Sequence, residues 1–228
     1  MKTNLKNHKE DIQAIREIME RSSKFLSLSG LSGIFAGLFA LIGAAIAWFY
    51  ILDSGNTKDF EYIAEKGNLL SSGAGFYLAL DAILVLGFAI LGAVYFSQRK
   101  ARKAGQLLWS NSTKHLLAYF MIPLVTGGIF ILILLFHHQI GLVAPAMLIF
   151  YGLSLVNAGK FTFGEIHYLG LTEIILGILA GVFINQGLLL WTIGFGIMHI
   201  VYGSVMYFRH EHERKEQGAG SIGKIRNP

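Results

Sequence analysis

Two ionisable residues, Glu173 and His199, lie deep inside apolar stretches of the sequence. Gln186, in the short polar segment between these stretches, lies thirteen residues from each of them. At a rise of about 1.5 Å per residue, both side chains are expected about 20 Å from that turn, near the middle of a bilayer. A carboxyl group and an imidazole at one depth can exchange a proton, bind a polar solute or clasp two helices together.

Small residues surround both positions at helical spacing. They are Gly170, Gly177 and Gly181 around Glu173, and Thr192, Gly196 and Gly203 around His199. Small residues let helices approach closely, so both side chains are expected to face protein rather than lipid. The sequence therefore predicts a polar site at the midplane, and either a functional role or a structural clasp explains it. A third ionisable residue, Asp81, is expected near the outer end of its span, within reach of water.

A second group of polar residues is expected nearer the cytoplasmic surface. These residues either line a cavity that opens inward or are ordinary residues of the membrane interface. The group consists of Ser154, Asn157, His167, His115 and Tyr119.

The elements that hold these residues are predicted from composition and length. Apolar residues make up 54% of the 228 residues and charged residues only 14%, with a mean hydropathy of +0.54. A soluble domain carries about 25% charged residues, so this chain is predicted to be a membrane protein. Six stretches are long enough to cross a bilayer, which predicts an all-α polytopic bundle of six transmembrane helices. The stretches are about 26–51, 75–97, 115–136, 140–158, 165–185 and 188–208, with very short turns at 136–139 and 185–187.

Lysine and arginine residues predict the orientation. Of the 19, all except Lys58 and Lys66 fall on one predicted side, which should be cytoplasmic. The predicted organisation is a cytoplasmic amphipathic helix over 1–25, a six-span domain over 26–208 and a cytoplasmic tail over 209–228. The N-terminal helix lies on the membrane, extends the first span or docks a cytosolic protein partner. The charge pattern explains the basic pI, so nucleic acid is not expected as a partner.

A shared motif suggests an internal repeat. Five of seven positions are identical between Gly33–Phe39 and Gly177–Phe183, and Leu91–Val94 and Tyr202–Val205 also share a glycine. Three tandem helical hairpins in parallel orientation would produce such a pattern, which some transporters use. Chance recurrence of small residues in apolar helices would also produce it.

Two further patterns carry structural predictions. The segment Thr162-Phe163-Gly164-Glu165 predicts a capping box at the start of the fifth span, which gives Glu165 a structural role. Pro123 and Pro145 are predicted to bend the third and fourth spans.

The segment Gly30-Leu31-Ser32-Gly33 resembles the G-x-S-G motif around the nucleophile of rhomboid intramembrane proteases. The resemblance implies a Ser32–His199 dyad with histidine as the general base. The rhomboid serine, however, lies on the fourth span near the outer side, whereas Ser32 is expected on the first span near the inner side. We therefore assign no catalytic residue. No metal ligand set is expected either, because only Glu173 and His199 share a depth, and the sequence names no cofactor.

The chain as a whole resembles an uncharacterised family of six-span proteins of Bacteroidota-type bacteria. Segments that carry the resemblance are Ile15–Arg21 and Gly194–His199. The resemblance implies a bacterial inner membrane, and it implies no activity. The leading functional hypothesis is binding or passage of a small solute or protons at the midplane. The alternatives are a sensor or scaffold that acts through a protein partner, and an intramembrane hydrolase.

Overall fold

The computed structural model describes residues 28–53, 73–105 and 109–212. Within these ranges the chain forms six long apolar helical spans and no strand, so the predicted all-α six-helix bundle is confirmed. The first five spans are α2 (Gly30–Asp53), α4 (Gly73–Lys103), α5 (Asn111–Phe136), α6 (Val143–Ala158) and α7 (Gly164–Val182). Their lengths and apolar composition suit a bilayer core of about 30 Å, and α6 reaches this length with its flanking 3₁₀ turns, over Ile140–Phe161.

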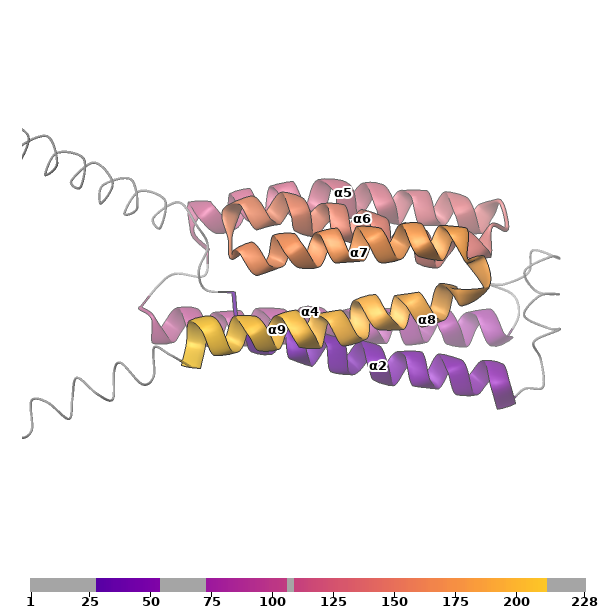
Figure 1. The fold of residues 1–228 in the computed structure, drawn as a ribbon, viewed down its shortest axis with the longest axis horizontal. Coiled ribbons are helices and arrows are strands. Elements are labelled where there is room, and N and C mark those ends of the chain that lie inside the picture. The colour runs from indigo at the N-terminus through magenta and orange to yellow at the C-terminus, as the bar shows by residue number, and fades with distance from the viewer. Residues whose placement is uncertain (1–27, 54–72, 106–108, 213–228) are drawn as a thin grey trace, which may run out of the picture.

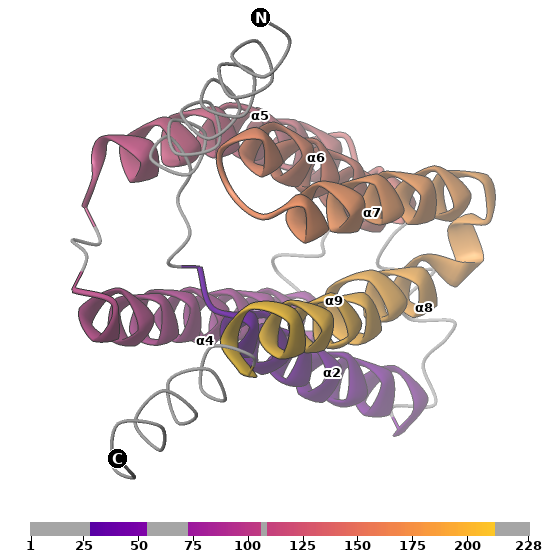
Figure 2. The same cartoon turned by 60° about the vertical axis from the view of Figure 1, so that its left-hand side comes forward.

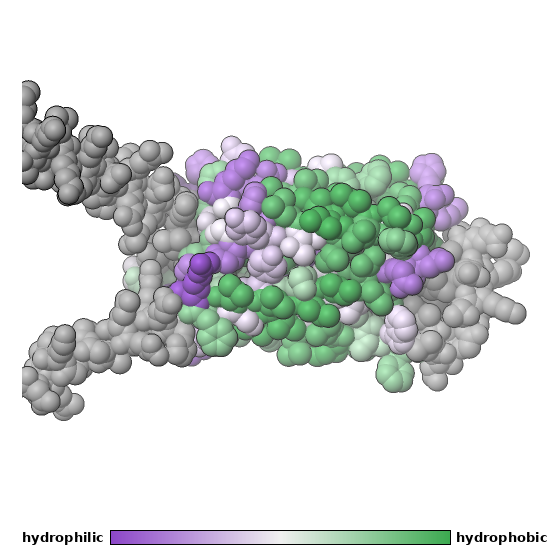
Figure 3. All heavy atoms as spheres, in the orientation of Figure 1, coloured by the Kyte–Doolittle hydropathy of each residue, from purple (hydrophilic) through white to green (hydrophobic). Residues whose placement is uncertain are grey.

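The sixth span is one continuous rod with changes of helical type. It contains α8 (Gly187–Trp191), a π-helical segment over Thr192–Met198, α9 (His199–Tyr207) and a second π-helical segment over Phe208–His212. Apolar side chains cover the middle of the bundle surface, and polar side chains gather toward its two ends (Figure 3). This pattern agrees with a protein whose middle contacts lipid.

The spans form two layers of three helices (Figures 1 and 2). One layer contains α5, α6 and α7, with α6 packed against both of the others. The other contains α4, α2 and the sixth span, with α2 packed against both of the others. The layers meet where α7 lies against the sixth span. Glu173 and His199, the residues predicted for the midplane, belong to these two facing helices.

Glycine residues hold the sixth span against α2. A Cβ atom added to Gly203 would lie 2.7 Å from the backbone nitrogen of Ile34 and 2.8 Å from the carbonyl oxygen of Gly30. One added to Gly33 would lie 3.2 Å from the Gly203 Cα atom. Because backbone meets backbone here, the contact has no side chain that can move aside.

A second glycine contact joins α6 to α7. A Cβ atom at Gly152 would lie 2.6 Å from the carbonyl oxygen of Gly170, and one at Gly170 would lie 2.7 Å from that of Gly152. One at Gly177 would lie 2.9 Å from the Ile149 backbone nitrogen. Each layer therefore contains a pair of helices in direct backbone contact.

Short turns connect neighbouring antiparallel spans, as predicted. His138, between α5 and α6, has a φ of 61°, a left-handed conformation that lets the chain reverse within a few residues. Between α7 and α8 the chain makes only the short 3₁₀ turn Ile184–Gln186.

The predicted capping box of the fifth span is wrong. α7 begins after Phe163, which takes the N-cap position predicted for Thr162 and whose side chain makes no capping hydrogen bond. Glu165 instead reaches Arg209 and His210 on the sixth span. A capping box does form at the start of α5, between Ser110 and Thr113. The Thr113 hydroxyl accepts from the Ser110 backbone N–H, a role that glutamate or glutamine fills in the usual capping box. A search for the usual sequence pattern therefore misses this capping box.

The two proline residues of the spans occupy different positions in their helices. Pro123 lies inside α5. Pro145 lies in the first turn of α6, which begins at Val143. Proline is well tolerated in a first turn, because few of the N–H groups there bond within the helix. The bends predicted at the two prolines stay predictions.

The shared glycine motif serves different partners in its two copies. Gly33 and Gly37 approach the sixth span, whereas Gly177 approaches Leu148 and Ile149 on α6. The nearest neighbours of Gly203 all lie on α2, and those of Gly92 belong to Phe35 on α2. Gly92 and Gly203 therefore both pack against α2. If the hairpins were repeats, Gly92 would pack against α2 and Gly203 against α7, the first helix of its own hairpin. The predicted helix over 1–25 and the tail beyond 212 lie outside the described residues and stay predictions.

Candidate functional site at the middle of the bundle

Glu173 and His199 meet between α7 and the sixth span. Glu173 is the central residue of Gly164–Val182, and His199 is the first residue of α9. The Glu173 side chain is fully buried, and its Oε1 atom lies 3.4 Å from Nδ1 of His199. The predicted meeting of the two residues is therefore confirmed, and both face protein. Their functional role stays a prediction.

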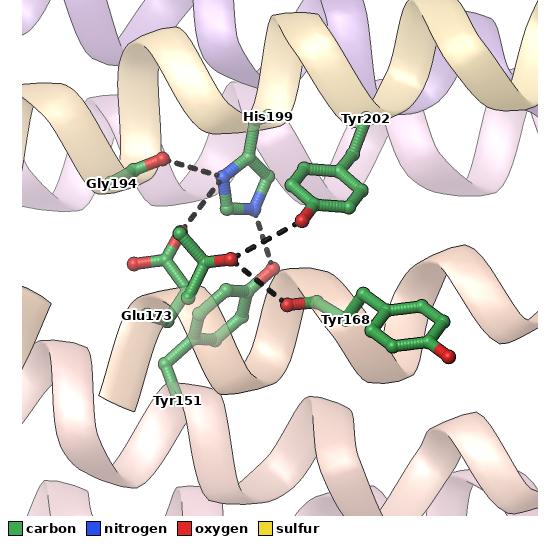
Figure 4. A network of polar contacts seen from close by, with 7 residues as sticks. Tyr151, Tyr168, Glu173, Gly194, His199 and Tyr202 are labelled. Carbon is green, nitrogen blue, oxygen red and sulfur yellow. Dashed lines mark hydrogen bonds and ion pairs between the residues drawn. The ribbon is translucent and has the colours of Figure 1, made fainter. Parts of the chain in front are cut away.

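Both nitrogens of the His199 ring have partners (Figure 4). Nδ1 lies 3.1 Å from the carbonyl oxygen of Gly194, and Nε2 lies 2.8 Å from the Tyr151 hydroxyl. A carbonyl oxygen only accepts, so Nδ1 must carry a hydrogen. In a neutral ring Nε2 then accepts from Tyr151, and in a charged ring Nε2 donates to it. The ring can therefore gain or lose a proton at Nε2 without losing either partner.

The carboxyl group of Glu173 is in a different situation. Neither of its oxygens has a hydrogen-bond partner, although both are buried. Nδ1 of His199 lies 3.4 Å from Oε1 but already donates to Gly194. A buried carboxylate without hydrogen bonds is costly, by several kcal/mol or more. The carboxyl group is thus the least satisfied polar group of the site.

The π-helical segment Thr192–Met198 gives the carboxyl group its space. Gly194 lies within this segment, and a Cβ atom there would collide with Oε2 of Glu173 and lie 2.6 Å from Cδ2 of Leu148. Any larger residue would fill the position of the carboxyl group. Such π-helical insertions are rare, and they often occur at functional sites.

Aromatic rings enclose the histidine. Tyr151 and Phe195 stack on His199, with centroid separations of 5.4 Å and 5.8 Å, and they contact each other at 4.9 Å. Trp191 packs on Phe195 at 5.0 Å. The imidazole therefore lies in an apolar surrounding with few polar neighbours, which strengthens the interactions that it does make.

A second polar contact joins the same two spans. Thr172, next to Glu173, contacts the Tyr202 hydroxyl at 3.2 Å and donates to the Tyr168 carbonyl at 3.0 Å (Figure 4). Tyr202 lies one helical turn beyond His199. The polar contacts thus continue along the interface, from the midplane toward the end of the bundle that contains Glu165 and Arg209.

Sequence reasoning missed Tyr151. A hydroxyl in an apolar span needs a hydrogen-bond partner. That requirement was a usable signal, but it did not identify the partner. Tyr151 belongs to α6, and only the packing of α6 behind α7 brings its hydroxyl to His199.

The five residues predicted for a cytoplasmic-side cavity have different surroundings, and the cavity itself stays a prediction. His115 and Tyr119 are exposed, and both stack on Phe161. Ser154 is fully buried and donates to the Phe150 carbonyl of its own helix. His167 lies against Gly159, where the helices are in contact, and Asn157 is half-buried on α6. Ser154 is thus a core residue, because its hydroxyl is satisfied within its own helix.

The Ser32–His199 dyad that the rhomboid resemblance implied does not form. Ser32 is buried, and its hydroxyl donates to the Ser29 carbonyl at 2.5 Å. Both His199 nitrogens have other partners, Gly194 and Tyr151. No histidine therefore activates Ser32 in this arrangement.

Asp81 lies apart from the midplane site. Its carboxyl oxygens are 3.2 Å and 3.3 Å from the position of a Cβ atom at Gly43, so the side chain faces α2. Among the described residues, no three His, Asp or Glu side chains are grouped so that they could hold a metal ion.

The chain matches no protein family, no curated protein and no solved structure with which it was compared. The assignment of the candidate site therefore rests on the geometry of its residues alone.

Proposed function

We propose that this membrane protein carries protons through the bilayer, alone or together with a small solute, by way of Tyr151, His199 and Glu173. One observation carries the proposal: a fully buried carboxyl group without hydrogen bonds lies 3.4 Å from a histidine that can exchange a proton at Nε2. Ionisable groups inside a membrane are costly and commonly mark paths for protons or ions.

Packing around Glu173 favours a proton over a larger cargo at this point. The Gly194 Cα atom and the Leu148 side chain fill the space beside Oε2, and the carboxyl group is fully buried. A solute would have to displace protein atoms, whereas a proton needs no additional volume. A solute that is coupled to the proton would therefore bind elsewhere on the interface between the layers.

Hydrogen bonds at His199 define a route for the proton. The Tyr151 hydroxyl gives its hydrogen to Nε2, which converts the ring to imidazolium, and takes a hydrogen back from water when the layers separate. The ring then gives its Nδ1 proton to the ionised Oε1 of Glu173 across 3.4 Å, which leaves a neutral carboxyl group and a neutral imidazole with its hydrogen on Nε2. This step breaks the hydrogen bond to the Gly194 carbonyl, and the bond forms again when a hydrogen returns to Nδ1 before the next cycle. The carboxyl group releases the proton when the helices separate and water reaches it, because water stabilises the carboxylate.

Proton flux into liposomes tests the proposal. Purified protein is reconstituted with a pH-sensitive dye inside, and a potassium diffusion potential, negative inside, is applied. Wild-type protein should acidify the interior faster than protein-free liposomes do. Glu173→Gln, which cannot ionise, should slow this acidification at least about tenfold, and His199→Gln should have an effect of similar size.

Asp81→Asn is the matched control, because it removes an intramembrane carboxylate outside the site. It should leave the flux unchanged. A wild-type flux equal to that of protein-free liposomes would contradict the proposal. Full flux in folded Glu173→Gln and His199→Gln variants would instead identify the pair as a structural clasp.

We further propose that the protein belongs to a bacterial inner membrane with both termini in the cytoplasm. The one-sided distribution of lysine and arginine supports this orientation. Because the chain has no cysteine, single cysteines at positions 62 and 104 report it directly. An impermeant thiol reagent should reach them from opposite sides, and labelling from the same side would overturn the orientation.

A further inference from the structure

A cluster of charged residues joins α7 to the sixth span at one end of the bundle. Arg209 donates to Oε1 of Glu165 at 3.1 Å, and His210 Nε2 donates to the same oxygen at 3.2 Å. Glu165 lies in the first turn of α7, whereas Arg209 and His210 lie in the final π-helical segment of the sixth span. We call this end of the bundle the basic end, since Lys100 and Lys160 also lie there.

A third helix takes part in this cluster. The ring of His210 stacks on Phe163, the residue before α7, with a centroid separation of 4.3 Å. The ammonium group of Lys100, on α4, lies 4.9 Å from the Phe163 centroid and donates to the Leu28 carbonyl at 2.6 Å. Both α4 and the sixth span therefore hold the start of α7, and both belong to the opposite layer.

Burial differs sharply among the members of the cluster. The Glu165 side chain is only 11% exposed, whereas those of His210 and Arg209 are 31% and 69% exposed. The shielded carboxylate depends on its two partners, since a buried charge that loses them is costly. The contact between α7 and the sixth span is therefore strong when Glu165 is ionised and both partners are charged, and weaker when one of these charges is lost.

The cluster lies on the same interface as the midplane site. Glu165 precedes Glu173 by eight residues on α7, or about 12 Å, and His210 follows His199 by eleven residues, or about 16 Å. Between them lie Tyr202 and its partner Thr172. Water that enters from the basic end between α7 and the sixth span would pass the cluster first.

We propose that Glu165, Arg209 and His210 form a gate that closes the basic end of the interface and so controls water access to Glu173. This inference rests on the proposed proton path. The gate is closed in the structure described here. It opens when the two layers separate at this end, which breaks polar contacts but leaves the glycine contacts within each layer intact.

Protonation of His210 sets the strength of the gate. The charged groups at this position are Glu165 on α7, Arg209 and His210 on the sixth span, and Lys100 on α4. When His210 is protonated, its hydrogen bond to Glu165 is charge-assisted at both ends, which makes it stronger. When His210 is neutral, this assistance is lost and the gate opens more readily.

Cysteine accessibility tests the gate without any transport measurement. Thr172→Cys places a thiol behind the gate in a chain that otherwise has no cysteine. The full-length protein is reconstituted so that an impermeant methanethiosulfonate reagent has access to the basic end. Glu165→Gln, Arg209→Gln and His210→Gln are each added to Thr172→Cys. Lys160→Gln, a change of an exposed lysine at the same end, is the matched control.

We expect labelling to be about tenfold faster in Glu165→Gln, and faster by a smaller factor in Arg209→Gln and His210→Gln, because each retains one partner of Glu165. Lys160→Gln should label like Thr172→Cys alone. Between pH 5.5 and pH 7.5, labelling in the Lys160→Gln background should rise more steeply than in the His210→Gln background. Dividing the labelling rate in one background by that in the other at each pH cancels the intrinsic pH dependence of the thiol.

Equal labelling rates in all folded backgrounds would overturn the gate. So would a pH dependence that His210→Gln leaves unchanged, since it would remove His210 as the sensor. If Glu165→Gln fails to fold, Arg209→Gln and His210→Gln decide the question by the same measurement. Failure of the proton path gives a different result: the labelling differences persist, while liposomes show no flux that depends on Glu173.

Discussion

The sixth span has two faces that are packed in opposite ways. Toward α2 it presents Gly196 and Gly203, and the two backbones touch. Toward α6 and α7 it presents His199, Tyr202 and His210, which make polar contacts through their side-chain ends. Backbone contacts cannot adjust, whereas polar side chains can exchange partners. The first face is therefore a fixed joint, and the second is the face at which the proposed gate opens.

This difference suggests how the protein moves. The layer of α4, α2 and the sixth span would move as one body against the layer of α5, α6 and α7. The short turn Ile184–Gln186 and the segment between α4 and α5 connect the layers. Rigid-body rocking around a midplane site is a common way to expose that site to one side of a membrane at a time. Four substitutions test the contrast between the two faces.

The largest effect is expected at the fixed joint. Gly203→Val would push side-chain atoms into the backbone of Gly30 and Ile34. Because no side chain can yield, we expect a loss of at least about 3 kcal/mol in stability, measured by reversible unfolding in mixed micelles. Gly87→Ala is the control, since no atom lies within 4 Å of its added Cβ. Equal stability of the two variants would remove the distinction between the faces.

A smaller effect is expected from Gly194→Ala. The new methyl group would collide with Oε2 of Glu173 and crowd Leu148, at a cost of about 2 kcal/mol. Unfolding of the single and double variants measures the coupling. In a Glu173→Ala background the cost should fall to about half, because one of the two crowded groups is gone. Strictly additive costs would show that Gly194 and Glu173 do not touch.

Tyr151→Phe should cost less again. It removes the hydroxyl that lies 2.8 Å from Nε2 of His199, for about 1 kcal/mol of stability. Nitrogen NMR of labelled histidine adds a sharper test. Nδ1 should keep its hydrogen in the variant, because the Gly194 carbonyl still requires a donor. A shift of the hydrogen to Nε2 would show that Tyr151, rather than Gly194, fixes the tautomer.

The smallest effect is expected from Thr172→Val. The variant loses the contact to Tyr202 but keeps the shape of the side chain. Hydrogen bonds between transmembrane helices average about 0.6 kcal/mol, so the unfolding free energy should change by about that amount. A loss as large as that of Gly203→Val would mean that the polar face is as rigid as the glycine face.

The sequence by itself determined the six spans, their antiparallel neighbours and the common depth of Glu173 and His199. These properties depend on apolar length, turn length and a fixed rise per residue, all of which are local. It also placed both residues on small-residue stripes, which correctly predicted that they face protein.

Only the tertiary structure decided which groups these residues meet. Tyr151 reaches His199 because α6 packs behind α7, and Gly194 reaches it because a π-helical segment rotates that part of the sixth span. Glu165, which was predicted to form a capping box, instead contacts Arg209 and His210, 44 and 45 residues away. Such contacts depend on how layers of helices meet. Spacing along a single helix does not encode that arrangement, because it is a property of several helices packed together.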